Sequence, residues 1–215
     1  MIEVAGRLSP DFEAIGYNVE NTWFGSVDAE ILYAMVIKFH PSKIIEIGSG
    51  NSTAISLAAM RINLRDGYGG TLIAIDPDPR AVLDPVVDHR RARIEEVPRE
   101  LFDWLVEGDI LFIDSSHKWG QGNDVDLLYH EILPALRSGV VVHAHDIFLP
   151  DPYPDTWSDR GYDEQEHLQS LLDTGEWEVL WSSHQMQQSS PELLEKTFAS
   201  YTPSRWPGSF WMRKK

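Results

Sequence analysis

The chain has 215 residues, of which 42% are hydrophobic and 11% aromatic, so its apolar content suits one folded domain rather than a disordered segment. Its formal net charge is −16, from 34 acidic and 18 basic side chains, and such a surface repels the phosphate backbone of DNA or RNA. The chain has no cysteine, which excludes disulfides and thiolate metal sites.

The N-terminal segment, residues 1–40, is a predicted helical lead-in to the first strand. Apolar residues at three- and four-residue spacing predict a helix over residues 27–39, with Ser26 or Asp28 as its cap. The first seven residues lack the basic start and apolar core of a signal peptide, and no apolar stretch is long enough to span a membrane. We therefore expect a cytoplasmic protein without a membrane partner. Whether it forms a homo-oligomer is left open.

The rest of the chain is organised around a strand-to-helix turn at residues 44–53. An apolar run stops at Gly48 and Gly50, and a helical pattern begins directly after them. Glycines permit a tight turn and let a ligand approach the backbone closely. Asn51 or Ser52 can cap the helix, whose free N–H groups form a positive end. The pattern favours a nucleotide-binding turn, although a tight turn without a ligand has the same pattern.

A second buried strand is predicted over residues 71–75, and Asp76 follows it directly. An acidic residue at this point binds ribose hydroxyls in dinucleotide-binding folds, so Asp76 is the expected ribose ligand, with Asp78 as the alternative. Asp-Pro pairs also begin turns, and turn formation is therefore the competing interpretation of Asp76.

The region between residues 80 and 100 is predicted to hold a short helix and then a third strand over residues 92–97. Three arginines, Arg90, Arg91 and Arg93, lie in or beside this segment. In a chain this acidic we expect them to form a solvated face with ion pairs.

The second half of the chain continues the alternation of strands and helices. Its predicted strands cover residues 109–114, 139–148, 177–181 and 208–212. Its predicted helices cover residues 125–136, 163–172 and 191–198. This alternation predicts a single α/β domain over residues 1–215, with a parallel sheet that helices cover on both faces.

An irregular segment over residues 149–163 follows the fifth predicted strand. It contains three prolines, which limit its freedom, and the aromatic residues Tyr153 and Trp157. A long loop beside a cleft is often a lid, so we expect this segment to close over an acceptor.

Three predicted strands end in side chains that can do chemistry. Asp76 follows the second strand, Asp114 and His117 follow the fourth, and His145 and Asp146 lie at the end of the fifth. Because the carboxyl ends of parallel strands meet at one edge of a sheet, we expect these side chains to converge on one cleft.

The turn at residues 46–50, which reads Glu-Ile-Gly-Ser-Gly, resembles the first motif of class I S-adenosylmethionine-dependent methyltransferases. The resemblance implies a Rossmann-like, mostly parallel seven-stranded sheet with helices on both faces and a reversed last strand. It also implies S-adenosylmethionine as the cofactor, with the acidic residue of the motif near the amino group and the glycines under the methionine part. The residues that it assigns to the cofactor are Glu46, Gly48, Ser49, Gly50, Asn51, Ser52, Asp76 and Asp114.

The ends of the fourth and fifth strands resemble the metal-dependent small-molecule O-methyltransferases and, more loosely, the antibiotic-tailoring methyltransferases. In the catechol-type members, an Asp after the fourth strand and an Asp-Asn pair after the fifth hold a divalent ion, and a nearby Lys takes the hydroxyl proton. The resemblance places Asp114, His145 and Asp146 at the metal and His117 at the base, with Asp114 also catalytic. An imidazole in place of a carboxylate disfavours Mg²⁺ and favours Mn²⁺, Fe²⁺ or Zn²⁺.

The histidines also have a structural interpretation. Strand-end histidines that only bond to backbone carbonyls are the competing reading of His117 and His145. His143 lies two residues before His145 and therefore on the same face of the strand, deeper in, and we interpret it as structural.

The sequence thus predicts a methyltransferase that moves a methyl group to a hydroxyl of a small molecule, such as a sugar, a natural product or a phenol, with metal assistance. One alternative is an NAD-dependent oxidoreductase, although Thr53 occupies the position of the third glycine in its motif. The others are a non-catalytic cofactor-binding protein of the same fold and an oxygen-dependent tailoring hydroxylase.

Overall fold

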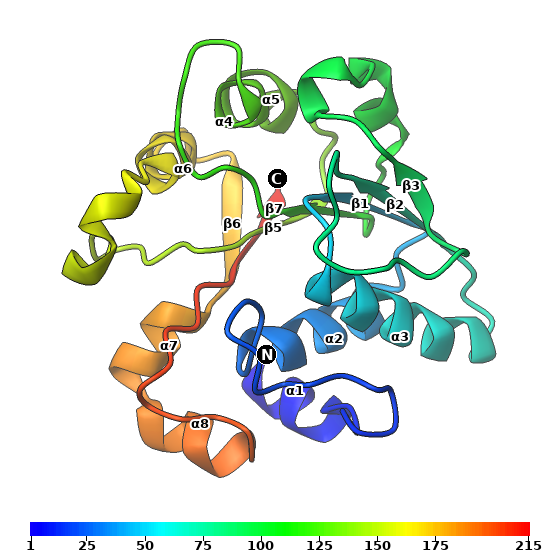
Figure 1. Ribbon diagram of the computed structural model, residues 1–215, viewed down its shortest axis with the longest axis vertical. Helices are drawn as coiled ribbons and strands as arrows, with labels where there is room; N and C mark the ends of the chain where they lie inside the picture. Colours follow the sequence, from blue (N-terminus) through cyan, green and yellow to red (C-terminus); the bar gives the residue numbers. More distant parts are fainter.

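Seven strands form one sheet in the computed structural model, which describes residues 1–215 (Figure 1). The strands are β1 (Lys43–Ile47), β2 (Thr71–Ile75), β3 (Asp88–Arg90), β4 (Ile110–Ile113), β5 (Val141–Ala144), β6 (Trp177–Ser182) and β7 (Phe210–Lys214). Their order across the sheet is β3-β2-β1-β4-β5-β7-β6. The first five strands are parallel, and β7 runs antiparallel to both β5 and β6. The Rossmann-like, seven-stranded sheet with a reversed last strand is confirmed.

Helices cover both faces of this sheet (Figure 1). On one face lie α1 (Ile2–Leu8), α2 (Asp28–Phe39), α3 (Asn51–Arg65), α7 (Ser183–Ser189) and α8 (Pro191–Thr197). On the other lie α4 (Asp124–Leu127), α5 (Leu133–Ala135) and α6 (Glu164–Leu172). The short turns η1 (Ile94–Glu96), η2 (Arg99–Trp104) and η4 (Asp155–Arg160) are 3₁₀ helices, and η3 (Leu128–Ile132) is a π turn. No helix is both long enough and apolar enough to cross a membrane.

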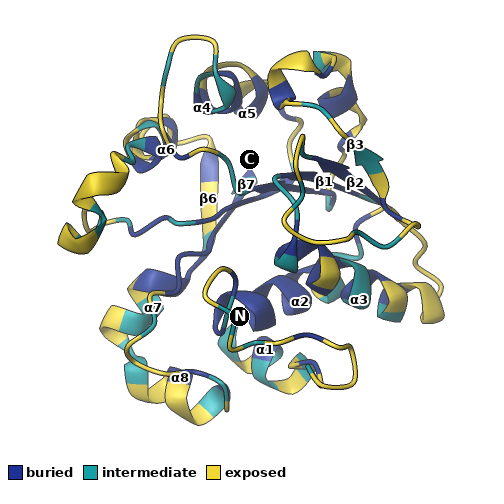
Figure 2. Ribbon diagram, viewed as in Figure 1, coloured by how far each residue is buried: buried dark blue, intermediate teal, exposed yellow.

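Alternation along the strands produces two cores. Successive strand residues point to opposite faces, so Ile44 packs into the core with α2 and α3, while Ile45 packs into the core with the α4–η3–α5 helix and α6. The central strands are buried, the edge strands β3 and β6 are partly exposed, and the outer surfaces of the helices are exposed (Figure 2). The near-continuous apolar runs of the central strands follow from this burial on both faces.

The predicted third strand was wrong. The structure has β3 at Asp88–Arg90, paired with the end of β2, and a 3₁₀ turn at Ile94–Glu96. Ile94 and Val97 are both buried, and their spacing of three residues fits a turn rather than the two-residue period of a strand. The short helix predicted after residue 80 is also absent, and prolines at positions 79 and 85 remove N–H donors there.

Helix and strand ends differ from the prediction in smaller ways. The predicted helix 125–136 is α4, η3 and α5 in continuous succession, so its middle is wound as a π turn. The predicted strand 139–148 ends at Ala144, because Asp146 has a left-handed backbone (φ 55°) that a strand cannot contain. The predicted helix 191–198 is confirmed as α8, but α7 before it was missed.

Candidate active site

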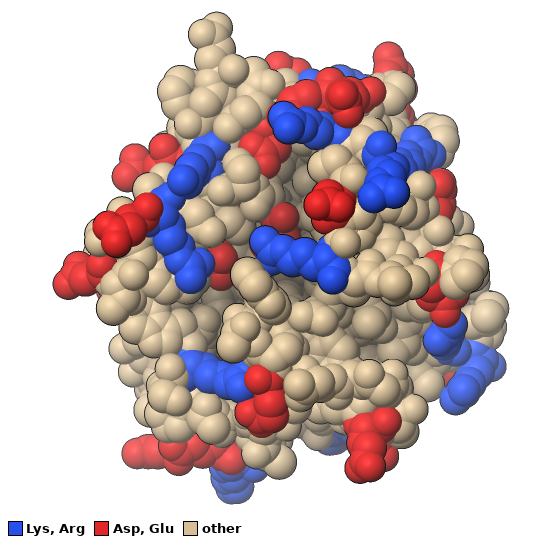
Figure 3. Space-filling model, in the orientation of Figure 1, with Lys and Arg blue, Asp and Glu red and all other residues tan.

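One cleft of about 1320 Å³ opens at the carboxyl ends of the parallel strands, visible as the hollow in the centre of Figure 3. Pockets for one small ligand commonly measure about 300–1,000 Å³. The cleft can therefore hold a cofactor and a second molecule together. Its walls come from the ends of β1, β2, β4 and β5 and from segments outside the sheet, within residues 21–28, 92–95, 123–124, 156–162 and 205–207.

The Gly48 turn forms one wall of the cleft. Gly48 has a positive φ of 79°, and a Cβ atom on it would collide with the carbonyl oxygen of Asp114. The glycine is thus needed for the close passage of the neighbouring strand exit, whether or not a ligand is bound. Gly48 and Ser49 line the cleft, whereas Gly50, Asn51 and Ser52, which the motif also assigned to the cofactor, do not.

Asp76 ties the second strand to this turn. Its Oδ2 accepts hydrogen bonds from the Ser49 backbone N–H at 2.8 Å and from the Ser49 hydroxyl at 2.9 Å, and its Oδ1 accepts one from the Asp78 N–H at 2.8 Å. Asp76 therefore does have the turn role that competed with ligand binding. It also lines the cleft, so its remaining lone pairs face the space beside Ser49.

Glu46, assigned to the cofactor by the sequence motif, does not line the cleft. Its carboxyl is fully buried under the turn, where Oε1 accepts the Ser52 hydroxyl at 2.5 Å and Oε2 has no partner. Burial raises the pKa of Glu46 to about 8, against the lowering effect of the hydrogen bond from Ser52. Glu46 is therefore neutral at pH 7 and holds the turn from below.

The raised pKa of Glu46 predicts how the stability of the fold changes with pH. An unfolded glutamate loses its proton near pH 4.5, whereas folded Glu46 keeps it up to about pH 8, so stability from this group falls as pH rises between these values. We expect Glu46→Gln to gain stability over wild type progressively from pH 5 to pH 8. Denaturant unfolding at several pH values measures this, with the exposed Glu100→Gln as the control. Parallel stability curves for wild type and Glu46→Gln would contradict it.

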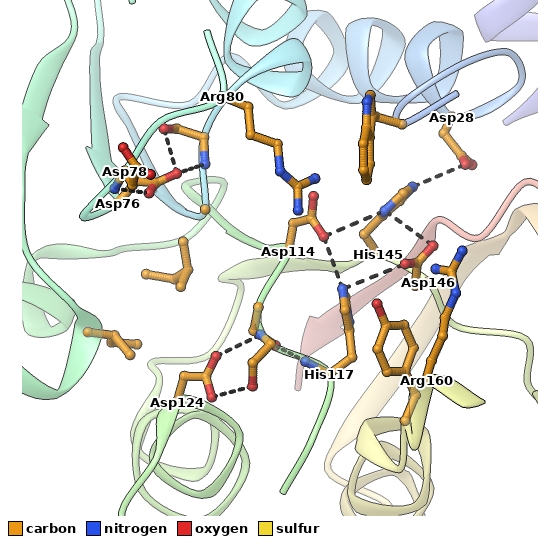
Figure 4. A pocket seen from close by; sticks show the side chains of 18 of the residues that line it. Asp28, Asp76, Asp78, Arg80, Asp114, His117, Asp124, His145, Asp146 and Arg160 are labelled. Carbon is orange, nitrogen blue, oxygen red and sulfur yellow. Dashed lines mark hydrogen bonds and ion pairs between the residues drawn. The ribbon is translucent and has the colours of Figure 1, made fainter. Parts of the chain in front are cut away.

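Four strand-end residues, Asp114, His117, His145 and Asp146, meet on the opposite wall and are here named the His–Asp cluster (Figure 4). His117 Nε2 lies 3.2 Å from Asp114 Oδ1 and 3.6 Å from Asp146 Oδ2. His145 Nδ1 lies 3.7 Å from Asp114 Oδ1 and 3.6 Å from Asp146 Oδ1. The structure thus brings together the residues that the strand ends predicted. Both imidazoles face the same two carboxylates.

A second pair of carboxylates holds the far side of each imidazole. His117 Nδ1 lies 2.7 Å from Glu164 Oε2, and Tyr129 donates its hydroxyl to Glu164 Oε1 at 2.8 Å. His145 Nε2 lies 3.4 Å from Asp28 Oδ2 (Figure 4). Each histidine is therefore fixed in orientation by one buried carboxylate behind it.

Sequence reasoning missed both of these carboxylates. Asp28 was interpreted as a helix cap, but it makes no capping bond. Instead it accepts the backbone N–H groups of Gly208 at 2.9 Å and Ser209 at 3.0 Å. Ser26, the other proposed cap, donates to Glu30 at 2.8 Å. Glu164 was the second residue of a predicted helix, and no local pattern in the sequence marks it as buried.

The carboxylates and imidazoles of the His–Asp cluster shift one another's pKa values. Burial disfavours the charge on His117, but its hydrogen bonds with Asp114 and Glu164 outweigh burial and hold its pKa well above the usual value. Burial is likewise outweighed at His145, whose pKa is raised by the charge of Asp146 and by its bonds with Asp114 and Asp28. Despite burial, the pKa of Asp114 is lowered by both imidazoles. The carboxylates thus favour the charged form of both imidazoles.

Two members of the cluster have left-handed backbones, His117 (φ 62°) and Asp146 (φ 55°). Residues other than glycine seldom adopt this region, and it persists where the surrounding structure holds it. The conformation turns both side chains out of their strand directions and into the cleft. His143, by contrast, stays fully buried, with its Nε2 2.9 Å from the Ser209 hydroxyl, which fits the structural interpretation.

The segment predicted as a lid borders the cleft next to this cluster. Thr156, Trp157, Arg160 and Tyr162 line it, and Trp206 lies across from them. Tyr153 does not line the cleft and packs behind. Whether the segment closes over an acceptor stays a prediction.

Comparisons with known proteins agree with this layout. A family model described as a methyltransferase domain matches residues 45–147. An O-methyltransferase from Bacillus cereus, solved in complex with SAH, superposes with a TM-score of 0.57 at 14% identity, covering 100% of both chains. The O-methyltransferase TomG from Streptomyces achromogenes, involved in tomaymycin synthesis and solved with SAM, gives a TM-score of 0.54 at 13% identity, covering 99% of this chain and 90% of TomG.

The apo structure of CmcI-N160 gives a TM-score of 0.52 at 16% identity, covering 89% of this chain and 72% of that one. At these identities the likeness shows a shared fold. A search of curated proteins found no match to the chain.

Proposed function

We propose that the chain is a class I S-adenosylmethionine-dependent methyltransferase and that it transfers a methyl group to a hydroxyl of a small molecule; the methyltransferase-domain match over residues 45–147 and the shared fold support this. The observation that carries the proposal is the division of the cleft. One wall has Gly48, Ser49 and Asp76, and the other has the His–Asp cluster. A methyl donor on the first wall would face an acceptor on the second.

The cluster supplies acid–base chemistry for a hydroxyl acceptor. A hydroxyl is a poor nucleophile until its proton is removed, and methyl transfer then needs alignment with the sulfonium methyl more than covalent help. His117 Nε2 is the candidate base, because it faces the cleft carboxylates while Glu164 holds its Nδ1. Because its pKa is raised, it must lose a proton before it can accept one.

We also propose that a divalent ion assists the reaction, held by Asp114, His145 and Asp146. Two carboxylates and an imidazole nitrogen are suitable donors, and Asp28 behind His145 supplies the outer carboxylate that metal-ligating histidines usually have. A bound ion would lower the pKa of the acceptor hydroxyl. The donors would have to close on the ion from their present ion-paired positions, because no group of three or more such side chains is already arranged to hold one.

Mass spectrometry of the small molecule that copurifies with the protein tests the cofactor. S-adenosylmethionine or S-adenosylhomocysteine is the expected result, and a dinucleotide would contradict the proposal. Transfer of a labelled methyl group to an acceptor then separates an enzyme from a binding protein of the same fold. Dependence of turnover on oxygen and iron would instead indicate a hydroxylase.

Asp76→Ala is expected to weaken binding of S-adenosylhomocysteine by about 10–100-fold, because charge-assisted hydrogen bonds to ribose hydroxyls are lost. Calorimetry measures the change. Asp78→Ala is the matched control, since Asp78 also lines the cleft but its side chain is 95% exposed. Ser49→Ala removes one of the two Ser49 bonds to Asp76 and shows how far the Ser49 hydroxyl contributes to binding. Equal affinity in wild type and Asp76→Ala would exclude Asp76 from the cofactor site.

A further inference from the structure

The cleft has cations without partners, although the chain is strongly acidic. Four arginines line it, and basic side chains border the hollow in Figure 3. Arg205 is paired with Glu20 at 2.9 Å and bonds to backbone carbonyls. Arg80, Arg93 and Arg160 have no carboxylate within 4.0 Å, which corrects the expectation that Arg93 would be ion-paired on a solvated face. The chain leaves these charges available to a ligand.

Two of these arginines, Arg80 and Arg93, lie on the side of the cleft where we place the cofactor. Arg93 follows β3, and Arg80 extends from the side of Asp76 towards Asp114 (Figure 4). The Arg80 guanidinium stacks on Trp23, 4.2 Å from the ring centroid. S-adenosylmethionine carries one carboxylate, on its methionine part, and we assign Arg80 to that group because it extends over the side of the cleft that has Asp76. Arg160 is therefore a cation that the cofactor does not require.

Arg160 lies on the acceptor side, on the same wall as Asp146 and His117 (Figure 4). Its guanidinium carbon is 3.7 Å from the ring centroid of Trp157 and 5.6 Å from that of Tyr162. Stacking uses the face of the guanidinium and leaves its in-plane N–H donors free. Such a fork matches the two oxygens of a carboxylate.

Flat aromatic surfaces stand beside this arginine. The rings of Trp157 and Trp206 are within 11° of parallel, with centroids 6.4 Å apart. Phe148 supports both from behind, edge-on, at 5.1 Å and 6.1 Å. Trp206 is 47% exposed, although it is a large apolar side chain on the rim of a cleft. These surfaces suit a planar apolar ligand.

The surrounding charge limits the anion that can bind here. Four carboxylates, those of Asp114, Asp146, Asp28 and Glu164, surround the two imidazoles of the His–Asp cluster. A single guanidinium among carboxylates matches the one negative charge of a carboxylate better than the two of a phosphate dianion. We propose that the acceptor is a hydroxylated aromatic carboxylate, with its ring against Trp157 and Trp206 and its carboxylate on Arg160. This proposal rests on the proposed methyl transfer in this cleft.

Two matched probes test it by calorimetry: 3,4-dihydroxybenzoate and 1,2-dihydroxybenzene, which differ only in the carboxylate. With the protein saturated by S-adenosylhomocysteine, the acid is expected to bind at least about tenfold more tightly than the neutral probe. Arg160→Gln should remove that difference and leave the affinity for the neutral probe within about twofold of wild type. Arg137→Gln, at an exposed arginine outside the cleft, should keep the difference.

Three outcomes would overturn the proposal: equal affinity for the two probes, a preference for the acid that survives in Arg160→Gln, or no binding of either probe at millimolar concentration. Trp157→Ala adds an independent check, since it should weaken the binding of both probes. Failure of the methyl-transfer proposal looks different, because either S-adenosylhomocysteine would not bind or no labelled methyl group would reach any acceptor. The two probes, repeated on the free protein, would still report on Arg160.

Discussion

Replacement of His117 by alanine is expected to lower kcat by about 10²–10⁴-fold, the usual contribution of a general base. His117 Nε2 faces the carboxylates of the cleft, and no lysine lines the cleft as a substitute base. Initial rates at saturating S-adenosylmethionine, with an identified acceptor, measure the loss. His130→Ala is the control, because His130 is exposed and outside the cleft. A His117→Ala enzyme within a few-fold of wild type would exclude the base role.

The pH profile separates a catalytic His117 from a structural one. Because Asp114 and Glu164 raise its pKa, the rate should rise with pH through a value above that of free histidine. In Glu164→Gln one of these anions is gone, so the rise should move to lower pH. If Glu164 has only a structural role, Glu164→Gln should change the stability or the maximal rate but leave the pH at which the rate rises unchanged.

Much of the fold followed from the sequence because its signals are local. The apolar runs of β1, β2, β4 and β5 are near-continuous, as burial on both faces requires, and glycine or aspartate ends three of them. The prediction failed at β3 because that strand has only three residues, Asp88–Arg90, and none of them is apolar. Ile94 and Val97, the apolar residues nearby, are buried by a turn instead.

The site was predictable only where its residues stand at strand ends. Topology alone brings Asp114, His117, His145 and Asp146 to one edge of the sheet, and the sequence order reveals that topology. Asp28 and Glu164 come from helices on opposite faces of the sheet, and their contacts depend on tertiary packing that no spacing encodes. Glu46 is the opposite case. The motif assigned it to the cofactor, but its side chain is buried beneath the turn and does not line the cleft.

Removal of divalent ions is expected to reduce turnover at neutral pH by about 10²-fold or more, the scale of the charge stabilisation that an ion provides. Dialysis against a chelator, followed by restoration of each ion, measures this. Mn²⁺, Fe²⁺ or Zn²⁺ should restore more activity than Mg²⁺, because His145 supplies a nitrogen donor. Asp28→Asn should weaken binding of the ion by about 10–100-fold, because Asp28 orients His145. Asp124→Asn is the control, since Asp124 lines the cleft but bonds to Ser116.

The protons of the cluster provide a test that does not depend on turnover. The pKa of His145 is raised by the carboxylates of the cluster, and an imidazole must lose its proton from the donor nitrogen to bind a metal. Binding of the ion should therefore release protons, which calorimetry in buffers of different ionisation enthalpy counts directly. Asp114→Asn and Asp146→Asn should abolish both the binding and the release. If the stripped enzyme keeps full activity and neither variant changes it, while His117→Ala abolishes turnover, the cluster works as a metal-free base on a more acidic hydroxyl.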